Sequence, residues 1–505
     1  MGFFGRQKRP DPPHPRQEPR YPGTLTAEHL EEIFSGCTDF NRRSLAVGGD
    51  ESRRMDLVFL SGMVKMERVS DYVLRPLAQD PALAQGSEAD AWARMKSGAL
   101  YNLTATVRTA LDDGVADLIA GNCLLLFPGK CEALSFNVGT EEKRGISNPE
   151  NETSIKGAGD AFVENLRTNT SLTRRHLRAP ELKIEEQIVG RQSLTPVDLL
   201  WLEGVANPET VDEVRKRVAD IDIDALLATG NLEEYIVDDL HTTFPLIQYT
   251  ERPDRFCAGL AEGRVGILME GIPLGYLAPG VIGDFLRAPQ DKSENWVLAS
   301  VLTVLRCLCL LVTLYLPAMY VAMVNFHPEM IPTRLALSIM AAKRDVPFST
   351  LFEVLLLLAA FEVLQEAGVR LPQAIGQTVS ILGGLVVGSA AVEAKIVSPA
   401  VLIVVAVAGI AGYTMPSQDL AGALRIWRFV LAALAGAAGL FGVVTGTALL
   451  VGHLAGLESF GVAYLTPFAS DAGEQTEGET VLRQPLPKDK LRPGYLKTAN
   501  RRRQR

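Results

Sequence analysis

The chain has 505 residues and a formal net charge of −9, enough for two to four ordinary domains. Its charge is unevenly distributed. Residues 1–295 carry 33 Lys/Arg and 46 Asp/Glu, residues 296–469 carry eight of each, and residues 470–505 carry nine and five. The first part is typical of an acidic soluble globule and argues against nucleic acid as a partner. The second is too apolar for a soluble domain, and the third is a basic tail.

Residues 1–34 begin with a Pro-rich, basic stretch. It has no apolar core of the kind that a secretory signal requires, so we expect a disordered N-terminus.

Residues 35–295 contain a repeated pattern. The segments 116–121 and 258–263 both end in Gly, an apolar run follows each, and a second Gly comes eight residues later, at Gly129 and Gly271. This pattern predicts a helix end, a buried strand, a turn and a second strand. We therefore expect an α/β soluble domain of two related subdomains, residues 35–150 and 151–295. Linking helices are predicted at 160–177 and at 208–218, the latter capped by Asn207.

Four apolar runs in residues 296–469 are long enough to cross a bilayer, which takes about 20 apolar residues. They are residues 297–326, 371–392, 396–418 and 429–457. A fifth segment, 348–368, carries Glu353, Glu362 and Glu366 around an apolar centre, which suits an interfacial, re-entrant or pore-side helix. The expected fold is an α-helical transmembrane bundle of four spans plus this partly inserted helix.

The number of crossings stays open. Four crossings place the acidic domain and the basic tail on one side, where the Arg-rich ending fits the cytoplasm. They also leave Lys343, Arg344, Arg425 and Arg428 on the other side. Five crossings move Arg425 and Arg428 to the cytoplasm but export the tail. We favour four.

Polar residues inside the apolar half are candidates for function. Arg306 lies nine residues into the first run, where Glu353 or Glu362 would be a natural partner. Gln377 and Thr378 give the second run a polar start, suited to a water path or to a hydrogen bond with a neighbouring helix. The candidate pore or gating residues are Glu353, Glu362, Glu366, Gln377, Thr378 and Arg306.

Two pairs of glycines, Gly384 with Gly388 and Gly442 with Gly446, have the GxxxG spacing that lets helices approach closely. They are candidates for helix packing, either between subunits around a shared axis or within one bundle.

No catalytic motif is present. The chain lacks HExxH, GxSxG, a P-loop and a GxGxxG after a strand, and its six histidines lie far apart. We therefore predict no enzyme activity, no cofactor and no metal site.

Several motifs resemble those of one family. They are TERPD at 250–254 with EGRV-x-IL at 262–268, FHPEMIPT at 326–333, the stretches 370–388 and 390–400, ENLRTN at 164–169 and EGVANP at 203–208. From about residue 35 to 468 the chain resembles the A subunits of bacterial spore germinant receptors, the GerA-type spore germination proteins.

The resemblance implies a multi-pass protein of the spore inner membrane with its N-terminal domain in the cytoplasm, the spore core. It implies a ring-forming homo-oligomer that acts as a nutrient-gated ion channel, in contact with membrane lipid. It also implies two partners, a transporter-like B subunit that takes the nutrient and a lipoprotein C subunit.

Two departures from the family pattern leave alternatives. Leu358 stands where family members often carry a further Glu, and we expect the basic tail to be particular to this chain. Both departures are consistent with a stage V sporulation paralogue that amplifies germination or with a specialised receptor. A non-conducting scaffold that couples other subunits is a separate alternative.

Overall fold

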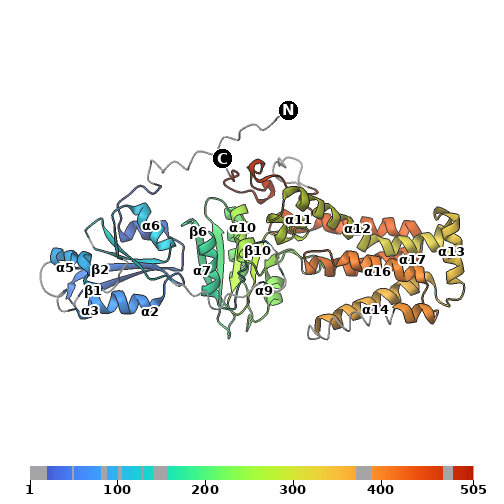
Figure 1. The fold of residues 1–505 in the computed structure, drawn as a ribbon, viewed down its shortest axis with the longest axis horizontal. Coiled ribbons are helices and arrows are strands. Elements are labelled where there is room, and N and C mark those ends of the chain that lie inside the picture. Colours follow the sequence, from blue (N-terminus) through green and yellow to red (C-terminus); the bar gives the residue numbers. More distant parts are fainter. Residues whose placement is uncertain are drawn as a thin grey trace, which may run out of the picture.

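In a computed structural model, the chain forms two α/β subdomains and a helical bundle that follow one another in a row (Figure 1). The structure describes residues 20–503 except for 48–49, 81–82, 84–87, 101–104, 128, 140–148, 150–151, 153–155, 371–387 and 470–481.

The first subdomain is built on a five-stranded antiparallel sheet in the order β1-β2-β4-β5-β3. The strands are β1 (Phe40–Val47), β2 (Asp50–Leu60), β3 (Thr106–Arg108), β4 (Asn122–Leu126) and β5 (Ala133–Asn137). Alternate residues of β2 and β4 point to opposite faces, so the sheet has two apolar cores. One face packs against α1 (Ala27–Ile33) and α6 (Leu111–Ile119), and the other against α2 (Met66–Val69), α3 (Arg75–Gln79) and α5 (Glu88–Arg94).

The second subdomain repeats this sheet order as β6-β7-β9-β10-β8. Its strands are β6 (Leu182–Val189), β7 (Thr195–Leu202), β8 (Gln248–Thr250), β9 (Val265–Met269) and β10 (Gly275–Ala278). One face packs against α7 (Leu166–His176) and α10 (Pro253–Glu262), the other against α8 (Pro208–Ala219) and α9 (Thr229–Ile236). The matching strand order confirms the prediction of two related α/β subdomains.

The glycines that revealed the repeat end equivalent helices. Gly121 follows α6 with a φ of +88° and Gly263 follows α10 with a φ of +109°, a backbone conformation that favours Gly. The next strand begins directly afterwards in both copies, as predicted.

The two linking helices differ in how well they were predicted. Helix α8 begins after Asn207, whose side chain accepts a hydrogen bond from the Glu209 backbone N–H, as expected. Helix α7 was predicted from residue 160 but begins at Leu166. Asn165 caps it by accepting from the Thr168 N–H at 2.9 Å, and the Phe162 N–H donates to the Glu251 carbonyl instead of to a helical partner.

The bundle contains α12 (Trp296–Phe326), α13 (Thr333–Lys343), α14 (Thr350–Arg370), α16 (Pro399–Gly412) and α17 (Gln418–Gly456). By length and composition, α12 and α17 could each cross a membrane. The predicted span 396–418 is a helix over only 14 residues, about 21 Å long, because Pro399 starts it and a turn follows Gly412. The predicted span 371–392 lies mostly outside the described residues.

Helix α17 doubles back on itself, so residues 429–457 do not form the single straight span predicted. Gly439 has φ +61° and ψ −138°, a conformation reserved for Gly. Beyond it the chain returns along its own path: a Cβ on Gly446 would meet the Leu431 side chain, and the Trp427 and His453 rings lie 6.1 Å apart. The two arms therefore form an antiparallel helical hairpin.

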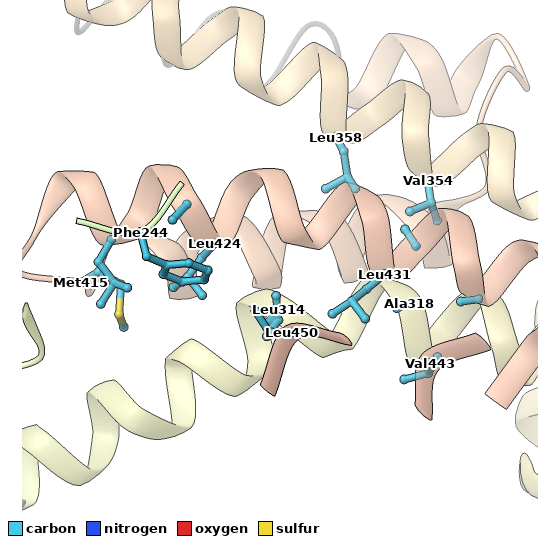
Figure 2. Packing of buried hydrophobic residues seen from close by; sticks show 14 of the residues in the cluster. Phe244, Leu314, Ala318, Val354, Leu358, Met415, Leu424, Leu431, Val443 and Leu450 are labelled. Atoms are coloured by element: carbon cyan, nitrogen blue, oxygen red, sulfur yellow. The ribbon is translucent and has the colours of Figure 1, made fainter. Parts of the chain in front are cut away.

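The bundle has an end near the α/β domain and an end far from it. The Gly439 turn lies against Phe326, the last residue of α12, at the far end, where α13 also lies (Figure 1). The second arm of α17 returns to the near end, where Ser459 donates to the Leu246 carbonyl at 2.7 Å. The apolar core of the bundle (Figure 2) continues into the second subdomain through Phe244.

Candidate functional site in the helical bundle

Glu362 of α14 pairs with two arginines of α17. Arg428 donates to one carboxylate oxygen at 2.6 Å and Arg425 to the other at 3.2 Å. The Arg428 side chain is 2% exposed, whereas Glu362 is 25% exposed. Because an unpaired charge is costly in a membrane bundle, this cluster ties α14 to the first arm of α17.

Glu353 lies in the first turn of α14 and is fully buried. One of its carboxylate oxygens accepts a hydrogen bond from the Ser398 backbone N–H at 2.7 Å, immediately before α16 begins. A negative charge at a helix N-terminus is favourable. The other oxygen has no hydrogen-bond partner among the described residues, so Glu353 has acceptor capacity that the described part of the chain leaves unused.

Arg306 does not pair with Glu353 or Glu362, contrary to the expectation. Its guanidinium turns back toward the α/β domain and donates to Asp291 of η3 (Pro289–Lys292), with Nη2 2.9 Å from the carboxylate. The long side chain reaches the near end of the bundle from within α12, as arginines commonly do at membrane boundaries. Arg306 therefore belongs to the junction between α12 and the α/β domain.

The structure describes only some of the remaining acidic and polar candidates. Glu366 is exposed and lies one helical turn beyond Glu362 on α14. Gln377, Thr378 and Gly384 lie outside the described residues. Leu358, the departure from the family pattern, is fully buried, and Figure 2 shows it with Val354 on α14, within the apolar core.

The glycine candidates pack helices of this same chain. A Cβ on Gly442 would collide with the Leu434 backbone oxygen across the α17 hairpin, and one on Gly446 would collide with Leu431. Gly388 faces Leu402 of α16, at 3.4 Å from its would-be Cβ. The spacing at 442 and 446 therefore serves close packing within the hairpin.

The second functional region is the junction at the near end. Residues 482–503, which we call the C-terminal strap, run across the second subdomain and the start of α12. Arg264 of this subdomain donates to both oxygens of Asp284, at 2.6 and 2.9 Å, and to the Tyr495 hydroxyl of the strap at 2.9 Å. At the other end of the strap, the Ser300 hydroxyl of α12 donates to the Arg483 carbonyl at 3.1 Å.

The strap therefore links the α/β domain to α12. Arg264 is 1% exposed. Burial lowers the pKa of its guanidinium, but the neighbouring Asp284, Tyr495 and Glu262 raise this pKa by more. Its charge is thus held firmly at the point where the strap docks.

Sequence reasoning missed Asp291, Tyr495 and the pairing of Arg425 and Arg428 with Glu362. The last could have been found, because these arginines and Glu362 are among the few charges in the apolar half and opposite charges there seek each other. Tyr495 gave no signal, since it lies in a segment without periodicity. Among the described residues, no group of three His, Cys, Asp or Glu side chains could hold a metal ion.

Residues 28–495 match the model of the Bacillus/Clostridium GerA spore germination protein family. The match reaches Tyr495, so the expectation that the basic tail is particular to this chain is wrong up to that residue.

Individual proteins are also similar to this chain over most of their length. The chain is 38% identical to the uncharacterized membrane protein YfkQ of Bacillus subtilis over 88% of this chain and 86% of that one. It is 35% identical to spore germination protein KA of Bacillus subtilis, over 92% and 85%, and 35% identical to spore germination protein GerLA of Bacillus cereus, over 93% and 95%.

A solved structure is also similar. The crystal structure of the N-terminal domain of the A subunit of the Bacillus megaterium spore germinant receptor GerK3 matches at 30% identity and a TM-score of 0.39, over 51% of this chain and 96% of that one. With a family match over most of its length and relatives covered almost end to end, the chain belongs to the GerA family of spore germination proteins, the A-type subunits of germinant receptors.

Proposed function

We propose that this chain is a ring-forming, nutrient-gated ion channel subunit of a spore germinant receptor. In this proposal residues 296–469 cross the spore inner membrane, and residues 35–295 lie in the cytoplasm of the spore core. A transporter-like B subunit takes the nutrient, and a lipoprotein C subunit completes the receptor.

The observation that carries the proposal is the set of carboxylates on α14. Ionisable residues inside a membrane are costly and commonly mark ion pathways. Glu353 keeps one oxygen without a described partner, and Glu362 stays partly exposed despite its arginine partners. A helix with such groups, repeated around a ring, would supply cation-attracting oxygens along a shared axis.

The test is release of K⁺ from liposomes that contain the purified oligomer, with and without its B and C subunits. We expect K⁺ release with the wild-type chain and at least about tenfold slower release with Glu353→Gln, since the uncharged amide removes the attraction for cations. The control is Glu329→Gln, the same change at an exposed residue of the far-end loop, which should release K⁺ at the wild-type rate.

Liposomes that stay tight with a folded oligomer and all partners present would refute the channel. If the solubilised protein has the mass of a monomer, a channel formed by several subunits around a shared axis is ruled out.

A second candidate is a non-conducting scaffold, including an accessory sporulation paralogue. It is favoured by Glu362, whose carboxylate is neutralised by Arg425 and Arg428 of the same chain, and by the apolar Leu358 in the middle of α14. Under this alternative, Glu353→Gln leaves ion release unchanged, whereas Tyr495→Ala, at the docking point of the strap, abolishes the response to nutrient.

A further inference from the structure

A partly open cavity of about 210 Å³ lies at the junction between the second subdomain, α12 and the C-terminal strap. Gly259 of α10 and Leu277 of β10 line it from the subdomain side, Thr303 from α12, and Leu482 and Leu486 from the strap. The cavity therefore exists only where three separate parts of the chain meet.

The lining is dominated by cationic side chains. The cations are Arg255, Arg264, Arg287, Lys292, Arg483 and Arg503, and the carboxylates are Glu262, Asp284, Asp291 and Asp489. Six positive and four negative groups give the lining a net charge of +2, although the chain as a whole carries −9.

Two of these cations are weakly neutralised. Arg483 donates to the backbone carbonyls of Asp291, Lys292 and Glu294, at 3.0 Å for Lys292, and no carboxylate pairs with it among the described residues. The Lys292 ammonium lies 3.5 Å from Glu262 and is 55% exposed. By contrast, Arg264 is fully engaged with Asp284 and Tyr495.

The field inside the cavity is positive even where a carboxylate is present. Burial raises the pKa of Glu262, but the nearby cations lower it by more, so that the pKa falls to about 2. These cations are Lys292, Arg264, Arg503 and Arg287. A carboxylate that stays ionised under such burial shows how strongly the surrounding cations favour a negative group.

The cavity also lies at the start of α12, one of the two helices long and apolar enough to cross a membrane. Helix α12 begins at Trp296, an aromatic residue of the kind that sits at headgroup level, and Thr303 lies two turns into the same helix. On the face of the helix turned away from Thr303, α12 exposes Val297, Val301 and Leu305, an apolar face suited to acyl chains.

From this geometry we propose that the cavity binds a phosphate group, with Arg483 and Lys292 as its principal cationic ligands. Arginine and lysine are the usual partners of phosphate oxygens. The phosphate belongs either to the headgroup of an anionic lipid, whose chains lie along α12, or to a free phosphate ion. Bound there, it joins the strap to η3 at the root of the first transmembrane helix.

The experiment uses the full-length protein. In nanodiscs of equimolar phosphatidylglycerol and phosphatidylcholine, native mass spectrometry counts the retained lipid. In lipid-free neutral detergent, inorganic phosphate is titrated against the thermal midpoint. We expect Arg483→Gln and Lys292→Gln, alone, each to weaken binding about tenfold, since a hydrogen bond to a charged group contributes about that factor.

The control pair is Arg191→Gln and Lys216→Gln, two exposed cations elsewhere on the same subdomain, which should leave binding unchanged. Retained phosphatidylglycerol without a phosphate effect identifies the lipid headgroup, and stabilisation by inorganic phosphate identifies the free ion. Arg483→Gln could release the strap, but Lys292→Gln lies on η3 and leaves the strap contacts in place. Binding that neither variant weakens, that the control variants weaken equally, or that is absent for both ligands would overturn the proposal.

Discussion

At the scale of single residues, a buried ion pair joins the two subdomains. Arg174 of α7 and Asp39, just before β1, are 1% and 0% exposed, and Arg174 Nη2 donates to Asp39 at 2.8 Å. Lys183 of β6 adds a second bridge by donating to the Ser35 carbonyl at 2.8 Å. These contacts fix the subdomains against each other.

Arg174→Met should lower the free energy of unfolding by about 3–5 kcal/mol, because it leaves Asp39 buried without its partner. Urea unfolding of the detergent-solubilised protein, followed by circular dichroism, measures this. The control is Arg191→Met, whose pair with Asp222 is about two-thirds exposed and should contribute less than about 1 kcal/mol. Equal losses for the two variants would contradict a special role for the buried pair.

A second buried carboxyl makes stability depend on pH. Asp198 of β7 is fully buried, and only one of its oxygens has described partners, the Thr170 hydroxyl at 2.8 Å and the Arg167 guanidinium at 3.7 Å. Burial raises the pKa of Asp198 from 3.8 to about 6. Since the folded pKa lies above the unfolded one, the neutral form is favoured in the fold, and stability falls as the pH rises from about 4 to about 6.

At pH values above 6, Asp198→Asn should therefore raise the thermal midpoint, with a gain in the free energy of unfolding of up to about 2–3 kcal/mol. The gain should vanish below pH 4. The reactivity of Cys257, buried in the same subdomain, with a thiol reagent during heating reports the midpoint. A lower midpoint for the Asn variant at every pH would mean that the ionised carboxylate, paired with Arg167, is what the fold needs.

Residue chemistry was only partly readable from the sequence. Glu353 and Glu362 stood out because charges in apolar segments are rare. The partner of Glu353 did not, since Ser398 contributes only a backbone N–H. Nor did the partner of Arg306, whose side chain could reach in either direction from α12. Which way a long side chain turns depends on the tertiary neighbours, here Asp291, and no local pattern encodes it.

At the scale of elements, the α17 hairpin is the clearest departure from expectation. The apolar run 429–457 fits one span by length, and Gly439 is one of six glycines within it. Nothing local distinguishes the glycine at the turn from those that pack helices, such as Gly446. By contrast, the strand pairs of the α/β subdomains were predictable because each carries its own turn glycines and apolar runs.

Gly439→Ala should lower the stability of the bundle by about 1–3 kcal/mol, because Ala disfavours this backbone conformation and its Cβ would lie 2.9 Å from Phe326. The matched control is Gly452→Ala in the same helix, where a Cβ would meet nothing within 4 Å. That change should be neutral or stabilising by up to about 1 kcal/mol. The thermal midpoints of the two variants are compared in detergent. Similar midpoints would contradict a tight turn of α17 at Gly439.

At the scale of the whole molecule, the hairpin sets the end of the bundle from which the C-terminal strap continues. The first arm carries Arg425 and Arg428 into the bundle, and the second arm returns the chain to the near end. The strap and the α/β domain therefore lie at the same end of the bundle, and the count of four crossings stays a prediction.

Helix α12 has 31 residues and is about 46 Å long, so it separates the loop after α13 from the strap by more than a bilayer core. In a Cys131→Ser background, Arg344→Cys and Lys488→Cys should react with a membrane-impermeant maleimide from opposite sides of sealed vesicles. Both positions are exposed, so poor reactivity would not arise from burial. Labelling of both from one side would show that α12 does not cross.

The strap has one more consequence, which concerns the order of synthesis. A ribosome releases the second subdomain long before residues 458–503, yet the Gly280 N–H needs the Ser459 hydroxyl and Arg264 needs Tyr495. The contacts of the subdomain are therefore completed only after the whole helical bundle has been synthesised. A nascent chain that stalls or terminates before Tyr495 therefore leaves the Arg264 surface uncovered.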